Sequence, residues 1–146
     1  MSSVSIKNFT RHSVPRFAYE EIVQQRLPGW EISLVFAGRT RAQRLNTELR
    51  GKTYVPNVLS YEVGRKSGEI IICPEAAAQQ APQYGLSPTD FMRYLFIHGI
   101  LHLEGRPHGV TMEKWEQKLF AQFAKGRLLH NTHVTPHRNR NRHRIA

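Results

Sequence analysis

The sequence predicts an α/β (α+β) fold, in which a mixed sheet of about four strands packs with about four to five helices in a single domain. Strand-like and helix-like patterns alternate along the chain, which is typical of such layered folds. Residues 70–72 are consecutive isoleucines, and a continuous apolar run favours a strand covered on both faces. Residues 88–103 are apolar almost all round a helix, which indicates a buried central helix.

The first half of the chain predicts two strands that alternate with two helices. Proline and glycine residues mark the boundaries, because they interrupt regular structure. The helix that ends at Gly51 carries several arginines on its outer side, and a solvated helix face is the simplest interpretation of each of them. The predicted elements are strands over residues 4–9 and 30–36, and helices over residues 15–27 and 39–50.

The second half is organised around the central helix. Ser87 is a good N-cap, Pro88 occupies the first helical position, and Asp90 follows three residues after the serine, as in a capping box. Gly105 is a natural C-terminal stop. The other predicted elements are strands over residues 57–63 and 69–73, a short helical turn over residues 75–81, and a last helix over residues 112–124 with Met112, Trp115, Leu119 and Phe123 inward.

The chain is strongly basic, with 21 lysines and arginines against 11 acidic residues and a net charge of +10. Residues 127–146 hold five of the arginines, no acidic residue and no apolar period, which predicts a basic, disordered tail after a domain over residues 1–126. This distribution favours a polyanionic partner, with nucleic acid first and an anionic membrane surface second.

The composition also limits the compartment and the chemistry. No run of about 18 apolar residues encodes a membrane span, and the N-terminal residues lack the apolar core of a signal peptide. Cys73 is the single cysteine, so neither an intramolecular disulfide nor a thiolate metal cluster is available. We therefore expect a cytoplasmic protein.

Three histidines at the end of the central helix predict a metal site. His98 and His102 are four residues apart and share one helix face, and His108 follows the Gly-Arg-Pro exit. Three neutral imidazoles suit one zinc ion and leave a fourth position for water, although nickel or copper also fits such ligands. The alternative is that the histidines are hydrogen-bonded core residues.

The surrounding residues disfavour two familiar chemistries. The spacing matches the metzincin pattern H-E-x-x-H-x-x-G-x-x-H, but position 99 is glycine, so the protease's general base is absent. Glu104 does not replace it, because two residues from His102 place it about 200° around the helix. Asp90 is the only aspartate in the chain and is engaged at a helix start, which disfavours a two-metal carboxylate nuclease.

The residues around this site resemble a known family. HGILHLEGRPH is similar to the HGxLHLxGxDH signature of the YbeY-type endoribonucleases. LNTELRGKTYVPNVLSYEV resembles their LNxxyRGkdxpTDVLSFp segment, and GEIIICPEAAAQQA resembles their GDIvIcxexaxxqA segment. These segments occur in the same order and cover residues 30–120. One departure is Pro107, which stands where the family has an aspartate, so any support that this carboxylate would give to a metal ligand is lost.

The resemblance implies a zinc-dependent endoribonuclease that prefers single strands and acts in ribosomal RNA maturation and ribosome quality control. It implies His98, His102 and His108 as ligands of one zinc ion, and ribosomal RNA and the small ribosomal subunit as partners. Arg50 falls on the family's functional arginine, and a guanidinium suits a scissile phosphate. Asn57 and Ser60 are weaker candidates for lining the substrate cleft.

Alternatives remain open from the sequence. Arg50 next to a glycine also fits a helix C-terminal cation with no further role. The whole protein also fits a ribosome- or RNA-binding assembly factor with structural zinc, or a metal-dependent hydrolase of another substrate.

Overall fold

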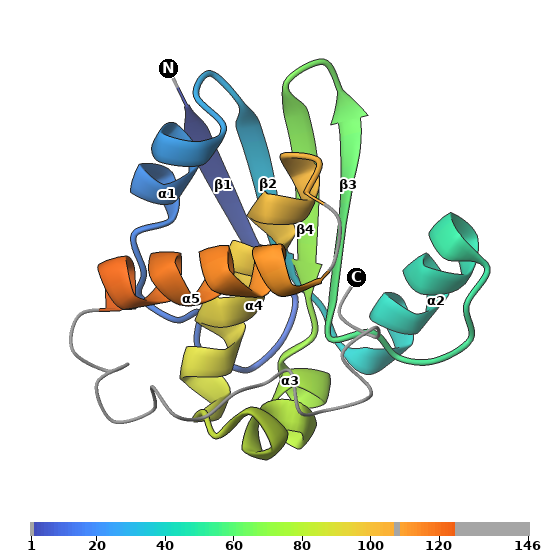
Figure 1. The fold of residues 1–146 in the computed structure, drawn as a ribbon. Coiled ribbons are helices and arrows are strands. Elements are labelled where there is room, and N and C mark those ends of the chain that lie inside the picture. Colours follow the sequence, from blue (N-terminus) through green and yellow to red (C-terminus); the bar gives the residue numbers. More distant parts are fainter. Residues whose placement is uncertain (1, 107–108, 125–146) are drawn as a thin grey trace.

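The computed structural model describes residues 2–106 and 109–124, which form a mixed sheet with helices packed on it (Figure 1). The fold class predicted from the sequence is confirmed. The strands are β1 (Ser3–Asn8), β2 (Glu31–Phe36), β3 (Val58–Gly64) and β4 (Ser67–Ile72). The helices are α1 (Tyr19–Arg26), α2 (Arg39–Arg50), α3 (Pro74–Gln80), the 3-10 turn η1 (Ala81–Tyr84), α4 (Pro88–Leu103) and α5 (Val110–Ala124).

The sheet has the strand order β1-β2-β4-β3. The strands β1, β2 and β4 are parallel, and β3 runs antiparallel to β4. Ile70 of β4 lies opposite Leu34 of β2 and opposite Ser60 of β3. Because side chains alternate between the faces of a sheet, these three residues point to the same face.

That face carries the main hydrophobic core. Figure 1 shows α1, α4 and α5 on one side of the sheet, with α5 crossing α4. Leu34, Phe36, Ile70 and Ile72 of the sheet are at most 1% exposed and belong to the same apolar cluster as α4. Burying such side chains stabilises the fold by about 1.5–3 kcal/mol each. On the other face, Leu45 of α2 packs against a smaller apolar cluster.

The helix α4 confirms the sequence prediction closely. The Ser87 hydroxyl accepts a hydrogen bond from the Asp90 amide at 3.1 Å, and Pro88 lies in the first turn. Most of the helix is buried, and it passes close to the sheet at Gly99, where an added Cβ would lie 3.1 Å from Ile70 Cδ1. A side chain at position 99 would therefore press into β4.

Two other helices differ from their predicted forms. The helix α1 begins at Tyr19 rather than at Pro15, and the Tyr19 hydroxyl donates to the Pro15 carbonyl. The helix α5 buries Glu116 and Phe120, whereas the predicted inward residues Trp115 and Phe123 are only half-buried. Trp115 lies at the margin of the core, where cationic side chains stack on its ring.

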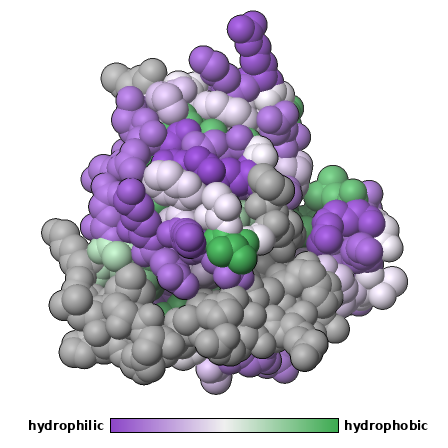
Figure 2. All heavy atoms as spheres, viewed as in Figure 1, coloured by the Kyte–Doolittle hydropathy of each residue, from purple (hydrophilic) through white to green (hydrophobic). Residues whose placement is uncertain are grey.

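The helix α2 stands apart from the other helices, to the right in Figure 1. The right side of Figure 2, where α2 lies, shows hydrophilic side chains with an apolar patch above them. Only Ala42 and Asn46 are buried in this helix, and its C-terminal end is closed by Gly51 with φ of 68°. Among the described helices, none is long and apolar enough to cross a membrane.

Candidate metal site

The histidine pair lies on the buried central helix. His98 is 3% exposed and His102 is half-buried. Residues four apart lie about 6 Å apart along a helix axis and share a face. The helix therefore presents both imidazoles on one side, as predicted.

Glu116 of α5 contacts the Nδ1 side of the His98 ring. Its Oε2 atom contacts His98 Nδ1, and its Oε1 atom accepts a hydrogen bond from the Tyr94 hydroxyl at 2.6 Å. Glu116 is 1% exposed, and a buried carboxylate is tolerated only when it is paired and hydrogen-bonded. With the Nδ1 proton donated to this carboxylate, Nε2 carries the lone pair that ligates a metal. The donor chemistry of His98 thus fits a metal ligand.

The structure gives a physical reason for the glycine at position 99. This residue faces Ile70 of the sheet rather than the side of α4 that carries the histidines. A glutamate here would place an unpaired charge in the apolar core. A metzincin-type general base has no room at this position.

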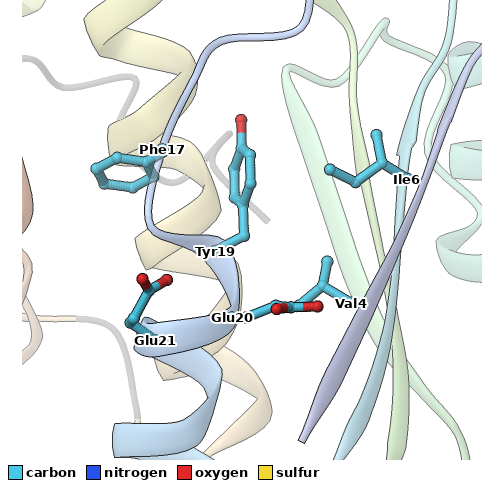
Figure 3. A pocket seen from close by; sticks show the side chains of 6 residues that line it. All are labelled: Val4, Ile6, Phe17, Tyr19, Glu20 and Glu21. Atoms are coloured by element: carbon cyan, nitrogen blue, oxygen red, sulfur yellow. The ribbon is translucent and has the colours of Figure 1, made fainter.

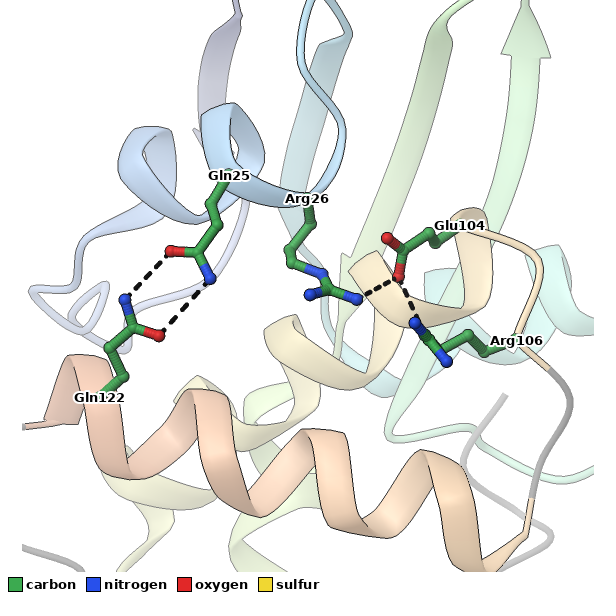
Figure 4. Close-up of polar contacts among 5 residues, drawn as sticks. All are labelled: Gln25, Arg26, Glu104, Arg106 and Gln122. Atoms are coloured by element: carbon green, nitrogen blue, oxygen red, sulfur yellow. Dashed lines mark hydrogen bonds and ion pairs between the residues drawn. The ribbon is translucent and has the colours of Figure 1, made fainter.

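The exit of α4 is clamped by ionic contacts (Figure 4). Glu104 Oε1 accepts from Arg26 at 2.9 Å and from Arg106 at 3.2 Å. Both guanidinium groups also stack on the Trp115 ring, at 4.4 and 5.0 Å from its centroid. The Glu104 carboxylate is therefore paired with two arginines, which disfavours it as a general base.

The same view shows a contact between α1 and α5. Gln25 of α1 and Gln122 of α5 exchange hydrogen bonds at 3.5 and 3.0 Å (Figure 4). The chain segment that leads toward the third predicted ligand is held at Arg106 by the ion pair with Glu104. His108 and Pro107 lie outside the described residues. Within residues 2–106 and 109–124, no three histidine, cysteine or acidic side chains form a metal-binding group.

Ser60 lies on β3, and Asn57 immediately precedes that strand. Ser60 lies opposite Ile70, which packs on Gly99, so its side chain points to the face that α4 covers. Asn57 Nδ2 donates to Gln80 Oε1 at 2.6 Å. Asn57 Oδ1 and Ser60 Oγ are buried and have no hydrogen-bond partner in the described part of the chain. Buried polar atoms of this kind are usually satisfied by water or a ligand.

Arg50 lies at the C-terminal end of α2. Its Nη1 atom donates to Asn46 Oδ1 at 3.3 Å and to the Tyr54 hydroxyl at 3.0 Å. The residue is exposed at the end of α2, and Figure 1 shows this helix to one side of α4. The sequence prediction therefore combines residues from α2 with residues from α4.

Two surface cavities lie elsewhere. One, of about 220 Å³, opens between β1 and α1 and is lined by Val4, Ile6 and Tyr19 among others (Figure 3). The second, of about 250 Å³, is lined by Phe9, Arg11 and neighbouring residues. Neither is lined by the described histidines of α4, so the candidate site is separate from both.

Glu116 is the site residue that sequence reasoning missed. The apolar positions of the last helix predict a stripe through Trp115, but the inward stripe runs through Met112, Glu116 and Leu119. The available signal was a single charged residue at helical spacing within that stripe. A buried acid needs a hydrogen-bonding partner, which the sequence alone does not identify.

The fold and the histidine pair define an α/β domain whose central helix carries a candidate metal site. The sequence profile of the family described as "Endoribonuclease YbeY" matches residues 1–126. The chain therefore belongs to the YbeY endoribonuclease family.

Individual relatives agree with this assignment. The Endoribonuclease YbeY of Bdellovibrio bacteriovorus is 31% identical over 120 residues, which cover 72% of this chain and 80% of the relative. That of Bordetella avium is 32% identical over 102 residues, covering 63% of each chain. The solution structure of TM1509 from Thermotoga maritima matches with a TM-score of 0.59 and 22% identity, covering 82% of this chain and 87% of the other. This structural likeness supports the fold.

Proposed function

We propose that the protein is a zinc-dependent endoribonuclease that prefers single-stranded RNA and acts in the cytoplasm in ribosomal RNA maturation and ribosome quality control. The family match supports an endoribonuclease, since the relatives carry that name. The observation that carries the metal part is the contact of His98 Nδ1 with Glu116, because it directs Nε2 of a buried helix-borne imidazole toward a ligand.

His98, His102 and His108 would hold the metal. The two residues on α4 are rigidly presented, since the helix is buried on most sides. A bound zinc ion supplies Lewis acidity and a water whose pKa is lowered to about 7. The role of the protein is to fix the imidazoles and to exclude competing ligands from the apolar surroundings.

The substrate would be contacted by polar groups on two elements. Arg50 presents an exposed guanidinium that suits bidentate contact with a phosphate. Asn57, which precedes β3, and Ser60, which lies on β3, carry buried oxygens that lack partners within the described residues. Hydroxyl and amide oxygens of this kind suit the sugar and base edges of an unpaired strand.

The charge of the chain supports a nucleic-acid partner. An excess of basic residues, with 21 against 11 acids, supplies salt-sensitive and sequence-independent affinity for a phosphate backbone. Ribosomal RNA of the small subunit is the proposed partner because the resemblance to the family implies it. The basic segment 127–146, which lies outside the described residues, is proposed to add to this affinity.

The test combines metal analysis with RNA cleavage by the full chain. Wild type, His98→Ala and His102→Ala are compared with His12→Ala, which removes an exposed histidine of the β1–α1 loop. Metal content is measured by mass spectrometry, and cleavage is measured on a single-stranded and a base-paired RNA. We expect wild type to carry zinc and to cut the single-stranded RNA faster. Each α4 variant should lose zinc and more than about 100-fold in cleavage rate, since removing a ligand exceeds the loss from its outer partners.

Each other outcome rejects part of the proposal. If wild type carries no zinc, or if the α4 variants cut RNA as wild type does, the metal-dependent nuclease is wrong. If the metal-free protein unfolds and the holo-protein binds RNA without cutting it, the assembly factor with structural zinc is supported instead. If RNA is untouched while another phosphoester or amide is hydrolysed, the substrate class is wrong.

A further inference from the structure

Glu116 and Tyr94 form a buried polar chain that ends on His98. Tyr94 is one helical turn before His98 on α4, and Glu116 lies across the contact between α4 and α5. All three residues are at most 3% exposed. The Tyr94 hydroxyl donates to Glu116 Oε1, and His98 Nδ1 contacts Glu116 Oε2. Each carboxylate oxygen therefore has its own partner.

This arrangement determines which nitrogen of the His98 imidazole carries the proton. An ionised carboxylate only accepts hydrogen bonds, so the proton in its contact with His98 belongs to Nδ1. In the neutral ring, Nε2 is then unprotonated and is the atom that ligates a metal. The ring orientation is fixed as well, because Glu116 is itself held by the Tyr94 hydroxyl.

We propose that Glu116, held by Tyr94, is a positioning residue that sets the tautomer and orientation of His98 for metal binding. This inference rests on the proposed function of His98 as a zinc ligand. Glu116 contacts the Nδ1 side of the ring, so it acts through His98 rather than on the metal or on RNA. Glu116 also supplies a carboxylate to the Nδ1 side of His98. No such carboxylate directly precedes His108 in this chain, because position 107 is proline.

The competing explanation is purely structural. A buried carboxylate shared by two helices also docks α5 on α4, and its loss would lower stability whether or not a metal binds. The two explanations differ in one respect. If Glu116 positions the ring, its loss changes the tautomer of His98 and the zinc affinity of the folded protein. If Glu116 only docks α5 on α4, its loss changes only the free energy of unfolding.

The experiment compares Glu116→Gln and Tyr94→Phe with wild type and with Glu48→Gln, which removes an exposed carboxylate on α2. The amide in Glu116→Gln keeps the shape of the carboxylate, accepts from His98 through its oxygen and donates to the Tyr94 hydroxyl through its nitrogen, so this variant should fold. The negative charge beside His98 Nδ1 is lost. Zinc dissociation constants are measured by competition with a chelator, and the His98 tautomer is read from imidazole nitrogen shifts in the metal-free protein, assigned with His98→Gln.

We expect metal-free wild type to show His98 protonated on Nδ1, and Glu116→Gln to bind zinc about 10- to 100-fold more weakly. Tyr94→Phe should weaken zinc binding less, because the carboxylate stays, and Glu48→Gln should leave zinc binding unchanged. If Glu116→Gln does not fold, Tyr94→Phe and the wild-type tautomer decide the question.

Three results would overturn the inference: Nε2 protonation of His98 in wild type, unchanged zinc affinity in a folded Glu116→Gln, or an equal loss in Glu48→Gln. A wild type that binds no zinc rejects the proposed function instead. In that case the tautomer measurement still tests whether Glu116 orients the ring.

Discussion

The helices α4 and α2 carry the two halves of the predicted site in opposite environments. In α4, 12 of the 16 residues are buried, and the polar side chains among them have partners. In α2, only two of the 12 residues are buried, and Arg50 is exposed beside Tyr54. The two predicted metal ligands on α4 therefore belong to a largely buried helix, whereas the phosphate-binding candidate lies on the surface.

This contrast indicates which property each region controls. A buried polar group is constrained because leaving it without a partner costs about 1–3 kcal/mol. An exposed arginine carries no such constraint, so it is available for a ligand. Substitutions in α4 should therefore affect folding and metal affinity, and substitutions in α2 should affect RNA with little effect on folding.

The largest difference in stability is expected between two single variants that each introduce a glutamate, one in α4 and one in α2. Gly99→Glu puts a carboxylate against Ile70 in the apolar core and should destabilise the protein by at least about 3 kcal/mol. Arg44→Glu places it on the exposed side of α2 and should change stability by less than about 0.5 kcal/mol. Thermal unfolding of both variants measures the contrast, and equal stabilities would refute it.

Arg50→Glu is the corresponding test on RNA. The lost charge-assisted contact with a phosphate should lower RNA cleavage by about 10- to 100-fold, while zinc content stays at the wild-type level. Arg44→Glu has the same change in net charge on the same helix and should lower cleavage much less. Cleavage rates at two salt concentrations separate the effects. Similar losses in both variants would mean that Arg50 contributes only general charge.

The ends of the two helices should respond differently to capping. Ser87→Ala removes the hydroxyl that accepts from the Asp90 amide and should cost about 1 kcal/mol. Gly38 caps α2 without a side-chain hydrogen bond, and Gly38→Ser should gain only a few tenths of a kcal/mol. Denaturant midpoints measure both changes. A neutral Ser87→Ala would show that packing alone determines where α4 begins.

A smaller effect concerns Tyr19, whose ring packs edge-on against Phe96 of α4 at 4.9 Å. Burial raises the pKa of Tyr19 to about 12, and the charge of Arg93 offsets part of this rise. The folded state therefore holds the proton more tightly than the unfolded chain, whose tyrosine pKa is about 10. This contribution to stability is intact below about pH 10 and is lost as the pH rises toward 12.

Tyr19→Phe should make the stability less sensitive to alkaline pH over that range. The remaining sensitivity includes Tyr61, because burial and its hydrogen bond to Glu69 also raise the pKa of that tyrosine. Unfolding midpoints at successive pH values check this. An unchanged pH dependence in Tyr19→Phe would contradict the burial argument.

Much of the fold could be predicted from local patterns. Alternation indicated the strands, and the Ser87 cap and the apolar surface of residues 88–103 indicated α4, because both signals depend on near neighbours in the sequence. The start of α1 was wrong, since Pro15 is also compatible with an extended segment before the helix. The sheet order depends on long-range pairing, for which the sequence has no local signal.

The candidate site divides in the same way. The spacing of His98 and His102 is a local helical property and was readable from the sequence. The partner of His98 was not, because Glu116 reaches it only after α5 has packed across α4. The position of Arg50 relative to α4 likewise depends on the tertiary structure. The metal ligation by these histidines stays a prediction.

The proposed metal site is tested most directly by anomalous diffraction at the zinc edge from crystals of the full chain. We expect a single strong peak bonded to Nε2 of His98 and to His102 and His108, at about 2.0–2.1 Å. His98 should meanwhile keep its Nδ1 contact with Glu116. A peak at other residues, or none at these histidines in zinc-soaked crystals, would contradict the proposed metal site.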